Sequence, residues 1–262
     1  MADRRPFLWI NDVSKTFLIG RERVEALHRV ELIVNKGEFV CLIGASGCGK
    51  STLLRIVAGF EQATLGDVRV YDSPIAGPGS DRGMVFQDFA LFPWMTVREN
   101  IAFGPKQKGL SKIQIDEKAS QFVEMVGLQR FAERYPYQLS GGMKQRVAIA
   151  RVLANEANVL LMDEPFGALD ALTREQLQDE LLQIWERTHV TVLFVTHSVE
   201  EATLLADRVV VMTAGPGRVE SDNRIRLPRP RDVSAPDFNG ARRDLTERLT
   251  SHISRRPLRN AA

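Results

Sequence analysis

One eight-residue stretch constrains the fold of this chain more than any other. Residues 44–51 read Gly-Ala-Ser-Gly-Cys-Gly-Lys-Ser and fit the pattern G-x-x-x-x-G-K-[ST]. That pattern works only between a strand and a helix, and both are predicted here. Glu38–Ile43 is a short apolar run, and Lys50–Ala58 has its apolar residues at helical spacing. The sequence therefore predicts a buried strand, a glycine-rich loop and a helix in direct succession.

Such a loop has the chemistry to bind the phosphates of a nucleotide. Its glycines let successive backbone N–H groups turn toward phosphate oxygens, and the positive end of the following helix adds to the attraction. Lys50 would reach the β- and γ-phosphates of ATP, and the Ser51 hydroxyl would ligate Mg²⁺. An ordinary glycine-rich turn is the alternative, and the flanking strand and helix count against it. The residues expected around the nucleotide are Gly44, Ala45, Ser46, Gly47, Cys48, Gly49, Lys50, Ser51 and Thr52.

A second apolar strand ends in two carboxylates. Val159–Met162 is followed directly by Asp163 and Glu164. A buried parallel strand delivers its last side chains to the carboxyl edge of the sheet, where ligands of α/β proteins bind. Asp163 suits the hydration shell of Mg²⁺, and Glu164 is placed to orient or deprotonate an attacking water. Alone, the pair is more typical of a helix start or a solvated turn, but a phosphate loop in the same chain favours the catalytic interpretation.

The composition is that of an ordinary globular chain. It has 262 residues, 44% of them hydrophobic, and a formal net charge of +2. No apolar run approaches the roughly 20 residues that a membrane-spanning helix needs, and Met1–Ile10 lacks the apolar core of a secretory signal. Cys41 and Cys48 are too few for a disulfide framework. We expect a cytoplasmic protein that does not itself cross a membrane.

Strands and helices alternate through much of the chain, which predicts an α/β fold with a mostly parallel sheet. The middle, roughly residues 88–157, is expected to form a helical insertion. The expected strands are Phe7–Phe17, Arg29–Val34, Glu38–Ile43, Gly66–Tyr71, Gly83–Phe86, Val159–Met162, Val190–Thr196 and Val209–Met212. The expected helices are Lys50–Ala58, Ser111–Val126, Ser140–Ala154, Leu172–Arg187 and Ser198–Ala206.

The C-terminal stretch differs from the rest in charge. Asp222–Ala262 holds ten Arg against five Asp and Glu, which gives it a charge of +5 and leaves −3 for residues 1–221. We therefore divide the chain into a nucleotide-binding domain, 1–221, and a basic extension, 222–262. Three prolines indicate a linker, and a weaker helix with Phe238, Leu245 and Leu249 as its apolar positions should follow it. The arginines are more typical of a solvated face than of a site for nucleic acid or anionic lipid.

A third segment, Leu139–Arg146, offers another helix start. Ser140 is a candidate N-cap, and Gly141 and Gly142 leave the backbone bare at the helix N-terminus, which suits an anion. Taken alone, the segment is better explained as an ordinary capped helix. One chain does not need two phosphate-binding helix ends for one nucleotide. Two chains arranged head to tail, each lending its second site to the other's ATP, would use both.

Together these segments resemble an ATP-binding subunit of an ABC transporter, from about Phe7 to Gly217. The resemblance implies a P-loop NTPase core of ABC type with an antiparallel β subdomain and an inserted α-helical subdomain. It also implies roles for four further residues. Gln87 would touch Mg²⁺ and the attacking water, so that Ser51, Gln87 and Asp163 form the metal set. Asp170 would communicate across a dimer, His197 would contact the γ-phosphate, and Phe17 would stack on adenine. The implied catalytic residues are Glu164, His197, Gln87 and Lys50.

Within that family, the chain looks like the nitrate, sulfonate and taurine importer group. The similarity lies in Gly77–Gly83, Leu91–Val97, Met162–Thr173 and Val192–His197. It implies a homodimer of ATP-binding subunits, integral membrane permease subunits and, indirectly, a periplasmic or extracellular solute-binding protein, with no nucleic acid. The protein would act peripherally at the cytoplasmic face of the inner membrane.

Other interpretations remain open at this point. The chain could be an ABC-type ATPase without a membrane partner, serving translation or DNA maintenance, although one phosphate loop and no sustained heptads speak against this. It could be an importer subunit for another small molecule. A nucleotide-binding module or small-molecule kinase would leave Leu139–Arg146, Asp170 and His197 unexplained.

Overall fold

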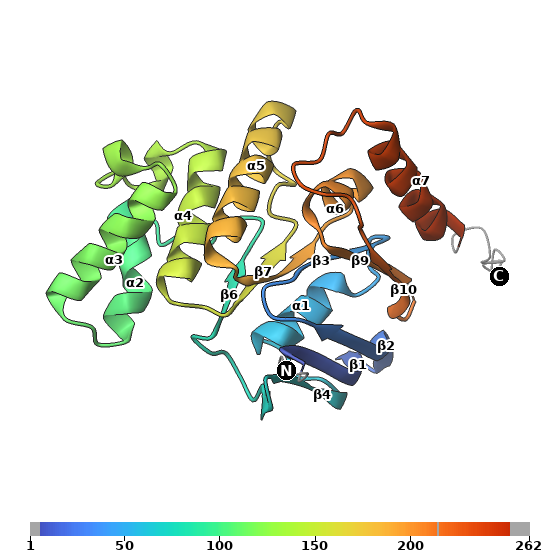
Figure 1. Cartoon of the computed structure of the whole chain (residues 1–262). Helices are drawn as coiled ribbons and strands as arrows, with labels where there is room; N and C mark the ends of the chain where they lie inside the picture. Colours follow the sequence, from blue (N-terminus) through green and yellow to red (C-terminus); the bar gives the residue numbers. More distant parts are fainter. Residues whose placement is uncertain (1–5, 214, 252–262) are drawn as a thin grey trace, which may run out of the picture. The chain divides into compact units, whose positions relative to one another are not determined.

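A computed structural model describes residues 6–213 and 215–251 of the chain (Figure 1). The chain divides into two compact units. One unit joins Met1–Gly77 with Leu193–Ala262, and the other is the intervening Pro78–Val192. The end of the predicted extension, residues 252–262, lies outside the described residues.

In the first unit, an antiparallel sheet has the strand order β2-β1-β4-β5. Its members are β1 (Leu8–Ile19), β2 (Glu22–Val34), β4 (Leu65–Val70) and β5 (Ser73–Pro74). Leu8 is buried and pairs with Val34 on one side and Val70 on the other. Strand β2 begins seven residues earlier than Arg29, the start expected from sequence. Its first four residues are all exposed, so they lack the apolar alternation on which the prediction depended.

The same unit holds a second strand cluster in the order β10-β9-β3-β8, in which β3, β8 and β9 are buried. β3 (Phe39–Gly44) is buried along its whole length and runs parallel to β9 (Arg208–Thr213), while β10 (Arg218–Arg224) is antiparallel to β9. β8 is Thr191–Val195, and the helices of the unit are α1 (Lys50–Ala58), α6 (Val199–Leu205) and α7 (Pro236–Ser251). Strand β10 was not expected, because its sequence is mostly polar, and it runs through the proposed boundary after residue 221.

The second unit combines two parallel strands with helices. β6 (Arg82–Val85) pairs with β7 (Val159–Asp163), and Val85 lies opposite Met162. The expected helical insertion is present, with α2, α3 and α4 packed side by side (Figure 1). The helices are α2 (Val97–Gln107), α3 (Lys112–Met125), α4 (Gly141–Ala154) and α5 (Ala171–Thr188), with short 3₁₀ turns at Gln129–Phe131 and Pro136–Gln138.

These elements confirm the predicted α/β architecture with an antiparallel β subdomain and a helical insertion. The helix expected in the C-terminal stretch is α7, which begins at Pro236, where the missing N–H costs nothing. Within the described ranges, no helix combines the length and apolar character needed to cross a membrane.

Candidate nucleotide site

The phosphate loop lies between β3 and α1, as its motif predicts. Gly49 forms the N-cap of α1 with a φ of 89°, in the left-handed region that favours glycine. A Cβ at Gly49 would also lie 2.5 Å from Leu27 Cδ2, so β2 packs tightly against the loop. Ala45, Ser46 and Gly47 are exposed, which leaves the crest of the loop accessible to a ligand.

Lys50 is buried and its charge is held against the loop. Its ammonium Nζ donates to Gly44 O at 2.8 Å and to Ala45 O at 3.2 Å, and it lies 3.6 Å from Cys48 Sγ. A buried ammonium needs such partners, and phosphate oxygens would be stronger ones. Cys48 is buried and fills the space beside Gly44, while Ser51 and Thr52 in the first turn of α1 are half-buried.

A residue that the sequence analysis did not select supports the loop from outside. Gly217 donates its N–H to Ala26 O at 2.9 Å and accepts from the His28 N–H at 2.9 Å. A Cβ at Gly217 would lie 2.0 Å from Cys48 O. No motif marks this glycine, because its constraint comes from contact with a segment far away in sequence.

His197 is exposed and sits between two residues with fixed positions, next to the strand that leads into the loop. The N–H of Thr196 donates to Leu42 O at 3.2 Å, in β3. The Thr196 hydroxyl donates to the Glu201 carboxylate at 2.6 Å and accepts from the Ser198 N–H at 3.0 Å. The Ser198 hydroxyl in turn caps α6 by accepting from the Glu201 N–H. The backbone on both sides of His197 is therefore tied to the first turn of α6.

Phe17, the expected adenine-stacking residue, lies on β1 where that strand pairs with Val24 of β2. It is half-buried, and the Lys15 ammonium lies 4.8 Å from its ring centroid. An open groove of about 540 Å³ runs along the ring and is lined also by Arg23 and Thr64. An accessible aromatic face beside a groove suits the stacking of a base.

In the second unit, the acidic residues and Gln87 leave neighbouring parallel strands at the same edge. Asp163 ends β7, and Gln87 follows β6 by two residues. A Cβ at Gly167 would lie 3.2 Å from Gln87 Nε2 and 3.4 Å from Glu164 O, so the amide lies against the turn after Glu164. Glu164 has a φ of 46°, which is rare for a residue with a side chain and costs about 1–3 kcal/mol. Such strain is typical of functional sites.

The predicted second anion site also lies in this unit. Ser140 is the N-cap of α4, and its hydroxyl accepts from the Met143 N–H at 3.3 Å. Cβ atoms at Gly141 and Gly142 would lie 2.9 Å from Leu169 Cδ2 and 2.9 Å from Thr173 Cγ2, respectively. The two glycines therefore also allow α4 to pack against Leu169 and the first turn of α5, a requirement that no motif marks.

Asp170 is exposed and is the N-cap of α5, because its carboxylate accepts from the Thr173 N–H at 3.0 Å. This hydrogen bond holds the pKa of Asp170 below its usual value. Asp170 thus has a structural role as a helix cap, beside the role in communication across a dimer that the resemblance implies.

The loop after Gln87 is apolar and carries Phe89, Leu91, Phe92, Pro93 and Trp94. It is organised by a residue that the sequence analysis did not select. Asn100 is fully buried in α2; its amide accepts from the Phe92 N–H at 2.9 Å and donates to the carbonyls of Phe92, Met95 and Thr96. Phe92 packs on Phe103, whereas Trp94 is 69% exposed. The loop thus presents an aromatic side chain on a rigid backbone.

The ABC transporter family profile matches residues 27–167 of the chain, a span that runs from β2 through the phosphate loop to the turn after Glu164. The chain belongs to the ABC transporter family. The nitrate import ATP-binding protein NrtD of Synechocystis is 51% identical to it over 221 residues, which is 84% of this chain and 83% of that protein. The taurine import ATP-binding protein TauB of Roseobacter denitrificans is 51% identical over 219 residues, 83% of this chain and 82% of that protein.

A solved dimer of an ATP-binding cassette in a post-hydrolysis state, bound to ADP and phosphate, has the same fold. Its TM-score is 0.74 at 35% identity, and the match covers 84% of this chain and all of that one. The predicted family and ABC-type fold are thereby confirmed. This ABC subunit is an ATPase coupled to transport.

The donor set expected for a metal fits Mg²⁺ better than a transition metal. Ser51, Gln87 and Asp163 supply oxygen atoms, and the described residues contain no group of three His, Cys, Asp or Glu that could hold a metal ion by itself. Magnesium is usually bound by one or two protein ligands together with substrate phosphates and water. Each of these three side chains therefore has the chemistry of a Mg²⁺ ligand.

Proposed function

We propose that this ABC subunit hydrolyses ATP to power import of a small anion or an organic sulfonate through a separate membrane permease. The observation that carries the proposal is the phosphate loop, with Lys50 buried against its carbonyls and Gly49 capping α1. The class of cargo is supported by the similarity to nitrate and taurine import proteins. The cargo need not touch this chain.

Binding of ATP would begin at the loop. The phosphates would accept from its backbone N–H groups and from Lys50, which would exchange the carbonyls of Gly44 and Ala45 for charged oxygens. The ring of Phe17 would stack on the adenine base. ATP binding should therefore depend on Lys50 for charge and on Phe17 for the base.

Hydrolysis would require a positioned and activated water. Glu164 would accept a proton from that water, Gln87 would orient it, and His197 with Lys50 would stabilise charge on the γ-phosphate. Ser51, Gln87 and Asp163 would hold Mg²⁺, which when bound neutralises developing phosphate charge.

The second anion site would act in a partner copy. In a head-to-tail homodimer, Ser140, Gly141 and Gly142 of one chain would contact the γ-phosphate of ATP held by the other, and Asp170 would lie near the dimer contact. Each ATP would then complete its set of ligands only when two subunits close, which makes closure dependent on the nucleotide.

Coupling to transport requires a membrane partner. The exposed Trp94, on the loop organised by Asn100, would contact a short cytoplasmic helix of the permease. The subunit would be peripheral at the cytoplasmic face of the inner membrane, and a solute-binding protein on the opposite side would deliver the cargo.

The experiment that tests this function replaces the proposed base. Glu164→Gln should retain ATP binding, lose nearly all hydrolysis and accumulate a nucleotide-bound dimer, as measured by nucleotide titration, phosphate release and size-exclusion chromatography. Glu186→Gln, at an exposed position on α5, is the matched control and should hydrolyse ATP normally. Unchanged turnover in Glu164→Gln would refute the role as base.

The cargo and the membrane partner need a separate experiment. Purification of the subunit from membranes should retain a hydrophobic permease, and the solute-binding protein of that complex should melt at a higher temperature with its true ligand. Nitrate, taurine and an alkanesulfonate are the ligands to compare. Purification without any membrane protein would favour an ABC ATPase outside transport.

A further inference from the structure

The C-terminal segment that follows β10 is attached to the last turn of α6. Arg231 donates from one nitrogen to the carbonyls of Thr203, Leu204 and Ala206 at 2.7, 3.0 and 2.7 Å. Arg229 donates to Leu205 O and pairs with Asp207 at 2.7 Å. The last carbonyls of a helix have no partner within the helix itself. Here two arginines from the C-terminal segment supply those partners.

Arg231 is half-buried, and burial lowers the pKa of its guanidinium to about 10, with the nearby Arg229 as the next cause. A cation in this position is costly unless its hydrogen bonds are satisfied. Its three carbonyl contacts therefore fix both the guanidinium and the turn that it touches.

Helix α7 attaches the same segment at two further places. Phe238 and Leu245 are buried at 1% and 2% exposure, and α7 packs on α6 and β9. Arg242 of α7 pairs at 2.7 Å with Glu200, in the first turn of α6. The segment thus contacts α6 near both of its ends.

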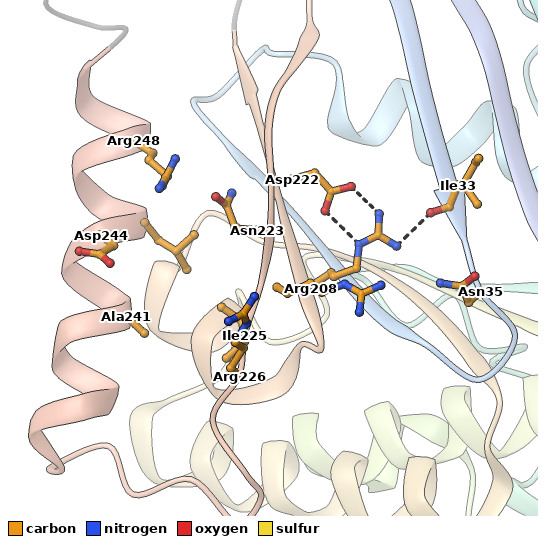
Figure 2. A pocket seen from close by; sticks show the side chains of 12 residues that line it. Ile33, Asn35, Arg208, Asp222, Asn223, Ile225, Arg226, Ala241, Asp244 and Arg248 are labelled. Atoms are coloured by element: carbon orange, nitrogen blue, oxygen red, sulfur yellow. Dashed lines mark hydrogen bonds and ion pairs between the residues drawn. The ribbon is translucent and has the colours of Figure 1, made fainter.

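Toward β10, helix α7 is not closely packed. A cavity of about 750 Å³ lies between α7 and β10, lined by Asn223, Arg226 and Asp244 among others (Figure 2). Arg208 at the edge of this cavity is already paired with Asp222 and Glu38 and donates to Ile33 O. The contacts with α6 and β9, rather than those with β10, therefore hold the segment in place.

Helix α6 is also the element that fixes His197. Its first turn accepts the Thr196 hydroxyl through Glu201 and is capped by Ser198, the two residues that flank His197. With only seven residues, α6 is too short to move at one end without moving at the other. A displacement of its last turn would thus reach His197.

We propose that residues 225–251 position His197 for ATP hydrolysis by holding α6, with Arg231 as the main positioning residue. The inference rests on the role proposed above for His197. It assigns the basic extension a function inside the ATPase unit, in place of a solvated face.

The test compares Arg231→Met, which removes the hydrogen bonds but keeps the stem, with Arg231→Lys and with Arg243→Met. Arg243 is exposed on α7 and serves as the matched loss of one charge. Because a displacement of about 1 Å can lower a rate about 100-fold, Arg231→Met should reduce kcat by about tenfold or more. The Kd for ATP should change little, since the phosphate loop is untouched. Arg231→Lys should recover part of kcat, and Arg243→Met should match the wild type.

A double variant separates this inference from the proposed function. If Arg231 acts through His197, Arg231→Met should lower kcat much less in a His197→Ala background than in the wild type. Equal reductions in both backgrounds would overturn the positioning role, whereas a His197→Ala protein with normal kcat would overturn the role of His197 itself. If Arg231→Met does not fold, Arg242→Met, which breaks the partly exposed pair with Glu200, provides the same comparison. A normal kcat in a folded variant of either arginine contradicts the proposal.

Discussion

Adding one methyl group at Gly217 tests how the phosphate loop is supported. Gly217→Ala places a Cβ 2.0 Å from Cys48 O, 3.0 Å from Cys48 C and 3.1 Å from Ala26 O. An ordinary contact is roughly 3.5 Å or longer, so about 1.5 Å of space must open between Gly217 and the loop. The methyl group meets backbone here, which cannot rotate away as a flexible side chain could.

Different contacts hold the two sides of this steric contact. Gly217 is held by two backbone hydrogen bonds of 2.9 Å, to Ala26 and from His28, each worth about 0.5–1.5 kcal/mol. The loop side carries Cys48 and the short turn around it. Overpacking of this kind costs about 1–3 kcal/mol of unfolding free energy. If the loop moves by about 1 Å, kcat/KM for ATP should fall by about 10- to 100-fold.

Urea unfolding and steady-state ATPase kinetics measure the two effects on the same protein. Gly77→Ala is the matched control, because nothing lies within 4 Å of a Cβ there, and it should leave both quantities unchanged. A Gly217→Ala protein with wild-type stability and kcat/KM would refute the steric argument. Loss of stability with normal kinetics would show that β2, rather than the loop, moves.

Perturbations at three other positions give distinct outcomes. Trp94→Ala should weaken co-purification with the permease more than it lowers intrinsic ATPase activity, whereas Phe60→Ala, at another exposed aromatic, should affect neither. Asp170→Ser keeps an N-cap and should preserve the melting temperature while lowering ATPase activity, but Asp170→Ala should lower both. The Thr173 amide lowers the pKa of Asp170, so the ionised carboxylate stabilises the fold above pH 3.8 and this stabilisation is lost on acidification. The melting temperature of the wild type should therefore fall toward that of Asp170→Ala at low pH. Gly240→Ala, in an open position within α7, should raise unfolding free energy by about 0.5–1 kcal/mol, and no change in a urea titration would mean that α7 contributes little.

Local patterns in the sequence predicted most of the elements. Helix α1 occupies the expected Lys50–Ala58, and Ser111 and Ser140 cap the helices that were expected to start there. The elements that were missed lack such patterns. Strand β10 is mostly polar because it lies at the edge of its strand cluster, and α2 contains Pro105 and Gly104, which obscure its helical spacing.

Motifs that bind a ligand were visible for a related reason, since their chemistry requires fixed residue types at fixed spacing. Gly49, Lys50 and the pair Asp163–Glu164 follow such rules. Asn100 and Gly217 follow no such rule, because each acts on backbone atoms. Asn100 contacts the carbonyls of the preceding loop, and Gly217 contacts Cys48, which is far away in the sequence. Carbonyl and amide groups occur at every residue, so a contact with them leaves no pattern in the partner's sequence.

Two residues that support the phosphate loop and helix α6 in the first unit lie after residue 206. Gly217 abuts the loop at Cys48, and Arg231 binds the last turn of α6. Neither residue would touch ATP, and both act through backbone. A substitution in this C-terminal stretch could therefore change the turnover of the subunit while every nucleotide-binding motif stayed intact. Turnover would then depend on the residues that support the motifs as much as on the motifs themselves. The kcat of Arg231→Met and the kcat/KM of Gly217→Ala would measure this dependence.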